Sequence, residues 1–283
     1  ANATDMVLPN DRQALKAGGY VYAEGTRNTF DFAYAPNGDL FGLDNAGDRD
    51  DSEELNWLRE GQHYGFPWRI GTSTTPMQFE GYDPDQDPFV QRDRNTNNLA
   101  DTGWYFSNDP TYPDPPEGVV FVDPIPNVGP YADSYRDETT GEVVDASETG
   151  TTIGTFTAHR SSLGLVFDAD SLVAEPMRGG GFMLSFNSAD DQMLARMGDT
   201  GEDLVFLDFE KVNENYTVSA HLVAHGFVHP IDAVMVENTI YVLEYGSWND
   251  FGDRRAVWAV TLPRYTGRAT ADGPARVKPE LAL

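Results

Sequence analysis

Six carboxylates fall within the eleven residues from 44 to 54, directly after a predicted β-hairpin. The alternating run 30–35, the Asn37-Gly38 turn signal and the run 39–44 indicate that hairpin. Calcium takes about six to eight oxygen ligands, so the loop is a candidate calcium site with the ligands Asp44, Asn45, Asp48, Asp50, Asp51, Glu53 and Glu54. Because the spacing is not that of an EF-hand, a solvated acidic surface is the alternative interpretation.

Two histidines occupy positions suited to proton transfer. His159, followed by Arg160, precedes a predicted core strand, and His229 opens another strand before Pro230. We predict both histidines as candidate catalytic residues that face the centre of the fold, with surface or structural roles as the alternative. The remaining histidines, His63, His221 and His225, are assigned structural or surface roles. Since no HxH or HExxH spacing occurs, a zinc site has little support.

Short strands separated by Gly, Asn or Asp recur from residue 156 to residue 261. They show no βαβ alternation, which predicts an all-β fold. The segments 30–45, 163–187 and 231–245 share one design, in which a strand and a turn lead to a second strand that ends in a polar or acidic residue. Such repeats at unequal spacing indicate β-propeller blades interrupted by insertions. About three blades can be placed in the sequence.

The segment 71–150 is rich in Pro, Asp and Asn. Its aromatic residues disfavour a disordered linker: they are Phe79, Tyr82, Trp104, Tyr105, Phe106 and Tyr112. We therefore predict an ordered insertion, with a mobile, exposed tip at 138–150. The predicted organisation is one partial propeller over residues 1–263 that contains this insertion, followed by a tail or linker over 264–283.

The 283 residues carry a net charge of −27, with 46 acidic residues against 19 lysines and arginines. The acids are spread over the whole chain, which favours saline surroundings, where ions screen their repulsion. Phosphate binding needs a basic face, so nucleic-acid and anionic-membrane partners are disfavoured. No apolar run reaches the ~18 residues of a membrane span. The absence of cysteine excludes disulfides and thiolate metal sites.

The stretch "GTRNTFDFAYAPNGDLFGLDN", followed by "EELNWLREGQHYGFPW", resembles the soluble quinoprotein glucose/sorbosone dehydrogenase family. Residues 157–263 are similar to the later blades of that family. The resemblance implies the C-terminal part of a six-bladed β-propeller that binds pyrroloquinoline quinone (PQQ) and Ca²⁺. The implied reaction is oxidation of a sugar hydroxyl by hydride transfer to the quinone, and the implied location is periplasmic or extracellular.

Carried over to this sequence, the resemblance implies that Arg27 and Asn28 face the cofactor, and Arg160 is a further candidate cofactor contact. A guanidinium suits the quinone carboxylates and carbonyl oxygens. The resemblance also implies that the loop 44–51 supplies calcium-bridging oxygens, largely backbone carbonyls, which adds Ala46 and Gly47 to the candidate metal ligands.

Two departures accompany the resemblance. The family's catalytic histidine lies on a blade before the Arg-Asn motif, and no histidine precedes Arg27; an arginine pair on the last blade is replaced by His229 and Ile231. We expect the remaining blades to come from further N-terminal sequence or from another chain, which also supplies the base unless His159 or His229 does so. The alternatives are a calcium-stabilised propeller that binds carbohydrate or protein without catalysis, and a structural role in a surface layer.

Overall fold

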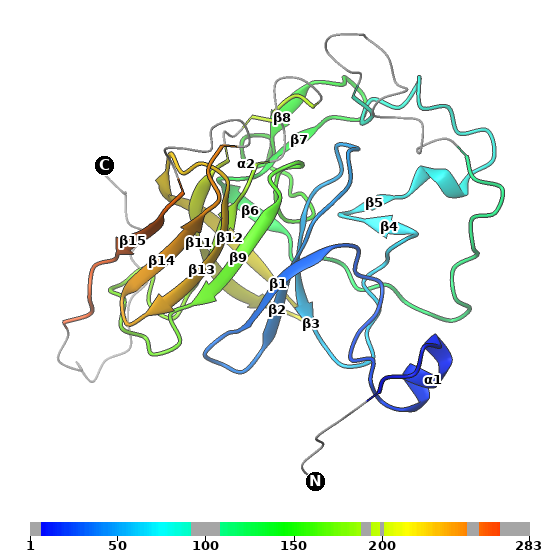
Figure 1. Ribbon diagram of the computed structural model, residues 1–283. Helices are drawn as coiled ribbons and strands as arrows, with labels where there is room; N and C mark the ends of the chain where they lie inside the picture. The colour runs from blue at the N-terminus through cyan, green and yellow to red at the C-terminus, as the bar shows by residue number, and fades with distance from the viewer. Residues whose placement is uncertain (1–6, 92–107, 188–193, 199–200, 248–254, 267–283) are drawn as a thin grey trace.

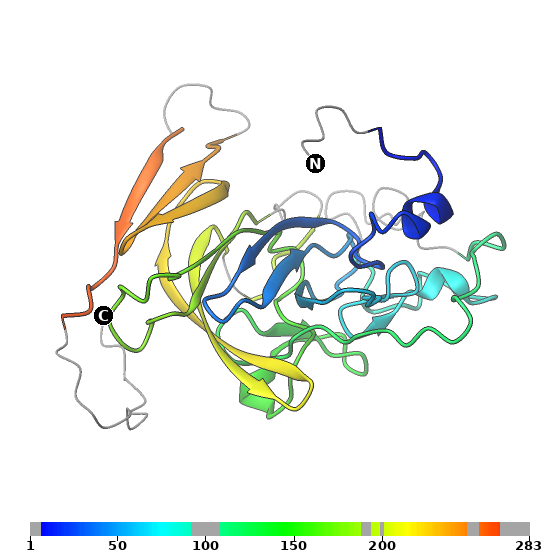
Figure 2. The ribbon, with the colours of Figure 1, turned by 90° about the horizontal axis from the view of Figure 1, so that it is seen from below.

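The computed structural model describes residues 7–91, 108–187, 194–198, 201–247 and 255–266. β-strands dominate these residues, and the α-helices among them are short: α1 (Arg12–Ala17) and α2 (Ala146–Thr149). Three larger antiparallel sheets lie side by side in a fan (Figures 1 and 2). Within the described ranges, no helix is long and apolar enough to cross a membrane. The prediction of an all-β fold is confirmed.

The first sheet is a meander of three strands, β1 (Thr29–Tyr34), β2 (Leu40–Asp44) and β3 (Glu54–Leu58). The hairpin β1/β2 is the predicted one, and Gly38 has φ +87° in its turn, a value that favours glycine. A helical turn is the local sequence expectation for residues 52–61, and it is wrong. Residues 54–58 instead pair with β2 along its whole length and bury Leu55, so tertiary pairing overrides local propensity.

The middle sheet is the largest. Its strands follow one another as β9 (Ser162–Phe167), β10 (Gly181–Ser185), β11 (Asp203–Val212) and β12 (Asn215–His225). A fifth strand, β6 (Asn127–Pro130), adds to β12 in parallel. Because β6 comes from the predicted insertion, this strand joins the insertion to the propeller body.

The third sheet is again a three-stranded meander, with β13 (Pro230–Val236), β14 (Thr239–Glu244) and β15 (Val257–Thr261). The inner strands β1, β9 and β13 lie next to one another, so the middle sheet stands between the other two (Figure 2). Fanned meanders with neighbouring inner strands are the blade arrangement of a β-propeller. The predicted partial propeller of about three blades is therefore confirmed.

Gly164 permits the close approach of β9 to β13. It lies at a bulge of β9 with φ +47°, and a Cβ there would meet the backbone nitrogen of Ala233 at 3.1 Å. Any side chain at this position would push the inner strands apart and strain the backbone.

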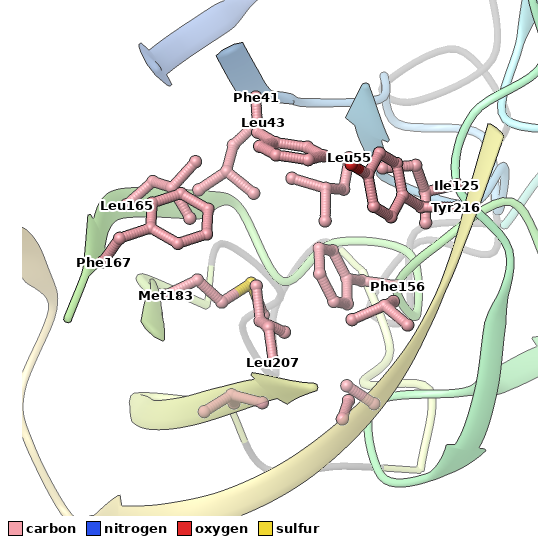
Figure 3. Close-up of a cluster of buried hydrophobic side chains, with 14 residues drawn as sticks. Phe41, Leu43, Leu55, Ile125, Phe156, Leu165, Phe167, Met183, Leu207 and Tyr216 are labelled. Atoms are coloured by element: carbon pink, nitrogen blue, oxygen red, sulfur yellow. The ribbon is translucent and has the colours of Figure 1, made fainter. Parts of the chain in front are cut away.

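The larger hydrophobic core lies between the first and middle sheets (Figure 3). Side chains of the first sheet meet side chains of the middle sheet there, and Ile125 and Phe156 come from the intervening segment. A second core fills the space between the middle and third sheets, with Phe182 and Leu184 on one side and Ile240 and Val242 on the other. The middle sheet is thus covered on both faces.

The insertion is ordered where the structure describes it. It holds β5 (Ser73–Thr74), which pairs with the preceding β4 (Arg69–Ile70), the 3₁₀ helix η1 (Pro76–Gln78), β7 (Ser134–Arg136) and β8 (Val143–Asp145). The predicted mobile tip contains β8 and α2, whose first turn is capped by the Asp145 carboxylate, so its backbone groups are paired. Trp104, Tyr105, Phe106 and the tail from residue 267 lie outside the described residues.

Candidate active site at the strand entrances

The inner strands β1, β9 and β13 begin at equivalent positions in their sheets. Their first residues, Thr29, Ser162 and Pro230, pair with the last residues of the second strands, Asp44, Ser185 and Glu244 respectively. Every predicted catalytic and cofactor-binding residue lies one to three positions before such a strand start: Arg27, Asn28, His159, Arg160 and His229. The fold therefore gives these residues equivalent places in successive blades.

Buried carboxylates hold the chain at each entrance. The Asp44 carboxylate accepts the backbone N–H groups of Arg27 and Asn28 at 2.8 and 2.5 Å. Burial raises its pKa, although these hydrogen bonds favour the charged form. At the third sheet, Glu244 accepts the Val228 N–H at 2.7 Å in the same way.

The middle entrance has a serine, Ser185, where the other two have an acid. There Glu53, the residue directly before β3, accepts the N–H groups of Ser161 and Ser162 at 3.1 and 3.4 Å. Burial raises the pKa of Glu53 to about 7. This carboxylate therefore ties the first blade to the second.

His159 lies beneath the surface against a carboxylate. Its Nε2 is 2.6 Å from Asp50 Oδ1, while Arg136 Nε donates to Asp50 Oδ2 at 2.5 Å, and His159 is only 3% exposed. The Asp50 carboxylate thereby fixes the imidazole ring and binds a guanidinium at the same time. In this arrangement His159 is part of a buried ion-pair network and does not line an open surface.

Arg160, the further candidate cofactor contact, is also buried in the interior. Its Nη2 donates to both oxygens of Asp203 at 2.7 and 2.6 Å, its Nε donates to Ser185, and Tyr131 donates to the same Asp203 carboxylate. Arg160 is 3% exposed and Asp203 is fully buried. A guanidinium held in this bidentate pair serves the fold, because releasing it would leave Asp203 charged and buried.

His229 is the more accessible of the two candidate histidines. A carbonyl oxygen only accepts hydrogen bonds, so the 2.9 Å contact between Nδ1 and the Gly246 oxygen places the proton on Nδ1. His229 Nε2 lies 3.9 Å from Glu202 Oε1. The ring packs on Phe186 with a centroid distance of 4.7 Å, and its side chain is one-fifth exposed. This is the arrangement of a proton acceptor with a carboxylate beside it.

Several carboxylates of the acidic loop make contacts within the fold. Besides the Asp44 and Asp50 contacts, Asp51 pairs with the Arg49 guanidinium, and Glu54 accepts from Asn56 and from the Gly71 N–H at 2.8 and 2.7 Å. Within the described ranges, no group of three or more His, Asp or Glu side chains could hold a metal ion. The Glu54 oxygens are hydrogen-bond acceptors within the fold, and calcium binding by the loop 44–54 stays a prediction.

Two backbone carbonyl oxygens of the same loop bind the guanidinium of Arg27. The Asn45 and Ala46 carbonyl oxygens accept from Arg27 Nη1 at 3.0 and 2.9 Å. Gly47 lies beside the same guanidinium, since a Cβ at this position would be 3.6 Å from Arg27 Nη2. These two carbonyls fit a hard cation in chemistry, but they supply only two of the roughly six oxygens that calcium requires. Asp48, the remaining predicted ligand, is half-buried.

Two further carboxylates of the loop have raised pKa values. Burial and the nearby Asp44 charge raise the pKa of Glu54 to about 8, and burial raises the pKa of Asp51 to about 6. Glu54 therefore holds its proton over much of the neutral range. The loop is less negative than its sequence indicates.

Sequence reasoning missed Asp203, Glu202 and Arg136, which lie far from the motifs in sequence, and it counted Glu53 only as a possible metal ligand. No local pattern marks the first three residues. His63 has the predicted structural role, since its Nδ1 accepts the Gly65 N–H at 3.1 Å. A surface hollow of about 470 Å³ near Tyr216 and Arg69 contains none of the predicted site residues.

No protein-family model and no curated protein matches the chain. Similar solved structures include the PQQ-bound aldose sugar dehydrogenase of Streptomyces coelicolor, at 14% identity and a TM-score of 0.41. A glucose dehydrogenase has 13% identity and a TM-score of 0.45. The apo-form of the soluble aldose sugar dehydrogenase of Escherichia coli has 13% identity and a TM-score of 0.39.

These alignments cover 84%, 90% and 84% of this chain, but 44%, 51% and 48% of the respective solved chains. The chain therefore spans about half the length of the structures that it matches.

Proposed function

We propose that this chain forms part of a quinoprotein that oxidises a sugar hydroxyl in saline surroundings outside the cytoplasm. The observation that carries the proposal is the geometry of His229, a partly exposed imidazole whose Nδ1–H is fixed by a carbonyl and whose Nε2 is the acceptor. His229 lies at the same kind of strand entrance as Arg27, the motif residue for the cofactor.

In the proposed reaction, His229 Nε2 takes the proton of the sugar hydroxyl as the C–H bond breaks. Glu202, 3.9 Å away, stabilises the imidazolium that forms. The quinone, when bound, accepts the hydride. Phe186 covers one side of the imidazole and excludes water from it. His159 is not the proposed base, because it is buried against Asp50.

Arg27 and Asn28 are the cofactor contacts that remain after Arg160 is assigned to Asp203. Arg27 is exposed and its guanidinium lies on two backbone carbonyls, so it can turn toward an anionic ligand at low cost. One guanidinium balances only part of the negative charge of a quinone with three carboxylates. We therefore propose that further cationic groups come from outside the described residues, and that calcium at the Asn45 and Ala46 carbonyls would replace the Arg27 contact.

The proposal is tested by titrating the chain with PQQ, with and without Ca²⁺, and following the quinone absorbance. We expect saturation that calcium strengthens, and a loss of affinity of about tenfold in Arg27→Gln, the size of one charge-assisted contact. Arg12→Gln is the matched control, since Arg12 is an exposed arginine paired with Glu24.

A dye-linked assay of aldose oxidation with bound PQQ then separates binding from chemistry. His229→Gln should bind PQQ normally and lose at least about a hundredfold in kcat, the usual contribution of a general base. The control is His221→Gln, on β12. No saturable binding at high micromolar PQQ in molar salt with calcium would contradict the proposed function, and a non-catalytic binding module would replace it.

A further inference from the structure

A surface hollow of about 470 Å³ lies beside the turn between β11 and β12, and we call it the hairpin hollow. The residues that line it come from four segments of this chain, which are 69–72, 123–126, 152–154 and 212–217. The ten-residue strand β11 runs from the strand entrance at Asp203 to the hairpin hollow, a distance of about 30 Å along the strand. The hairpin hollow is therefore distinct from the candidate active site.

The hairpin hollow is also distinct from the open faces of the outer sheets. It lies at the middle sheet, which packs against the first sheet on one side and the third sheet on the other. A further sheet would therefore pack on the first or the third sheet. The walls of the hollow are the β11/β12 hairpin, part of the insertion and the loop 152–154, so its shape is set within this chain.

The floor of the hairpin hollow is apolar. Ile153 and Tyr216 line it and are only 5% and 6% exposed. The Tyr216 hydroxyl group is bound to Asp39, so this tyrosine offers its ring carbons to a ligand. Tyr216 lies beside Ile125 at the margin of the larger core, which holds this side of the floor in place (Figure 3). An apolar floor with a few polar groups around it is typical of small-molecule sites.

Hydroxyl groups without internal partners surround this floor. Thr72, Thr152 and Thr217 line the hollow, and their side chains make no hydrogen bond to any other residue that the structure describes. Thr155, only three residues after Thr152, is instead bound to two backbone groups in the core. Because a hydroxyl group both donates and accepts, these threonines suit a ligand that carries hydroxyl groups itself.

The charges around the hollow balance one another. Arg69 donates to Asp123 at 2.5 Å, and the Asp123 side chain is 69% exposed. An adjoining hollow of about 370 Å³ shares Asp123 and Asn215 with the first and adds Arg59 and Glu214. Two arginines therefore face two acids, while the whole chain carries a net charge of −27. This balance disfavours an anionic ligand and favours a neutral one.

We propose that the two adjoining hollows form a groove that binds a neutral oligosaccharide. The apolar floor takes the C–H face of a sugar ring, and the threonine hydroxyls bind its hydroxyl groups. The exposed Arg69–Asp123 pair contributes little to stability, so both side chains can turn toward a sugar at low cost. The groove would hold the protein on a glycan, independently of the proposed oxidation at His229.

The test is a titration of the chain, without PQQ, with maltotriose, cellotriose and methyl β-D-glucoside, followed by ¹H–¹⁵N NMR. At least one trisaccharide should saturate with a Kd of about 1 to 10 mM, with the largest shifts at the amides of Thr72, Gly154 and Thr217. It should bind at least about threefold more tightly than the glucoside, because it fills both hollows. Trigalacturonate, an anionic trisaccharide, should bind at least about fivefold more weakly.

Variants of the groove test the assignment. Asp123→Ala and Thr217→Val should each raise the Kd of the trisaccharide about fivefold, the effect of one lost hydrogen bond. Their matched controls are Asp114→Ala and Thr151→Val, exposed residues that do not line the groove and should leave the Kd within about twofold. His229→Gln should also leave it unchanged, which separates this site from the proposed active site. Circular dichroism checks that each variant is folded, and Asp123→Ala replaces an exposed side chain.

Several results would overturn the proposal. One is the absence of saturable shifts with either trisaccharide up to about 50 mM. Another is a set of shifts centred at the strand entrances and lost in His229→Gln, which would place the sugar at the proposed active site. Tighter binding of trigalacturonate would make the groove an anion site. Controls that weaken binding as much as the groove variants would place the sugar elsewhere.

Discussion

The middle sheet and the two outer sheets have the same local plan but different surroundings. In all three, a bulged inner strand pairs with a second strand whose last residue lies opposite the strand start. Among the described residues, only the middle sheet has a neighbouring sheet on each side, and its second strand β10 is buried throughout. The comparison teaches that turns and registers are set within a blade, whereas the stability of each blade depends on its neighbours.

The largest expected difference concerns aromatic residues on the two kinds of sheet. Phe182→Ala removes a fully buried ring of the middle sheet and should lower the free energy of unfolding by about 4 kcal/mol, because the cavity adds to the lost burial. Phe32→Ala on the first sheet should lower it by less than about 0.5 kcal/mol. Urea unfolding measures both values. Equal losses would show that Phe32 is already covered.

Removing a buried ion pair of the middle sheet should also cost more stability than removing an exposed ion pair beside the third sheet, but the difference should be smaller than for the aromatic residues. Asp203→Asn leaves Arg160 buried without its counter-charge and should cost about 3 kcal/mol of stability. The control is Glu237→Gln beside the third sheet, whose partner Arg264 is half exposed, with an expected cost below about 0.5 kcal/mol. Thermal unfolding at fixed pH compares the two variants. A cost below 1 kcal/mol for Asp203→Asn would mean that solvent reaches the Arg160 guanidinium.

The third expected effect is a pH dependence at the edge of the first sheet. The pKa of Glu54 is raised from its usual value to about 8, so the folded protein keeps a proton that the unfolded chain has lost. Its stabilising contribution is complete below the usual pKa of a glutamate and is lost as the pH rises toward 8. Between pH 5 and 8, the free energy of unfolding of Glu54→Gln should fall by about 1 kcal/mol less per pH unit than that of the unchanged protein. Parallel urea midpoints across this range would contradict the assignment.

The strands of the propeller were predictable because each is an alternating or β-branched run bounded by turn residues, as in the hairpin around Asn37-Gly38. The exception, β3, has acids that resemble the start of a helix, and its pairing with β2 decided its structure. The candidate histidines were found because both precede a predicted strand. Their different roles were not predictable, since Asp50 and Gly246 lie 109 and 17 residues away from them.

The sequence by itself determined the blade repeat, the positions of the strand entrances and the acidic character of the chain, because these depend on local pattern and composition. Tertiary structure decided which acids are buried acceptors, which arginine remains exposed and which sheet faces are covered. The physical reason is that burial and ion pairing depend on the residues that folding brings together. Asp203 and Arg160 are 43 residues apart in the sequence and are bound to each other in the fold.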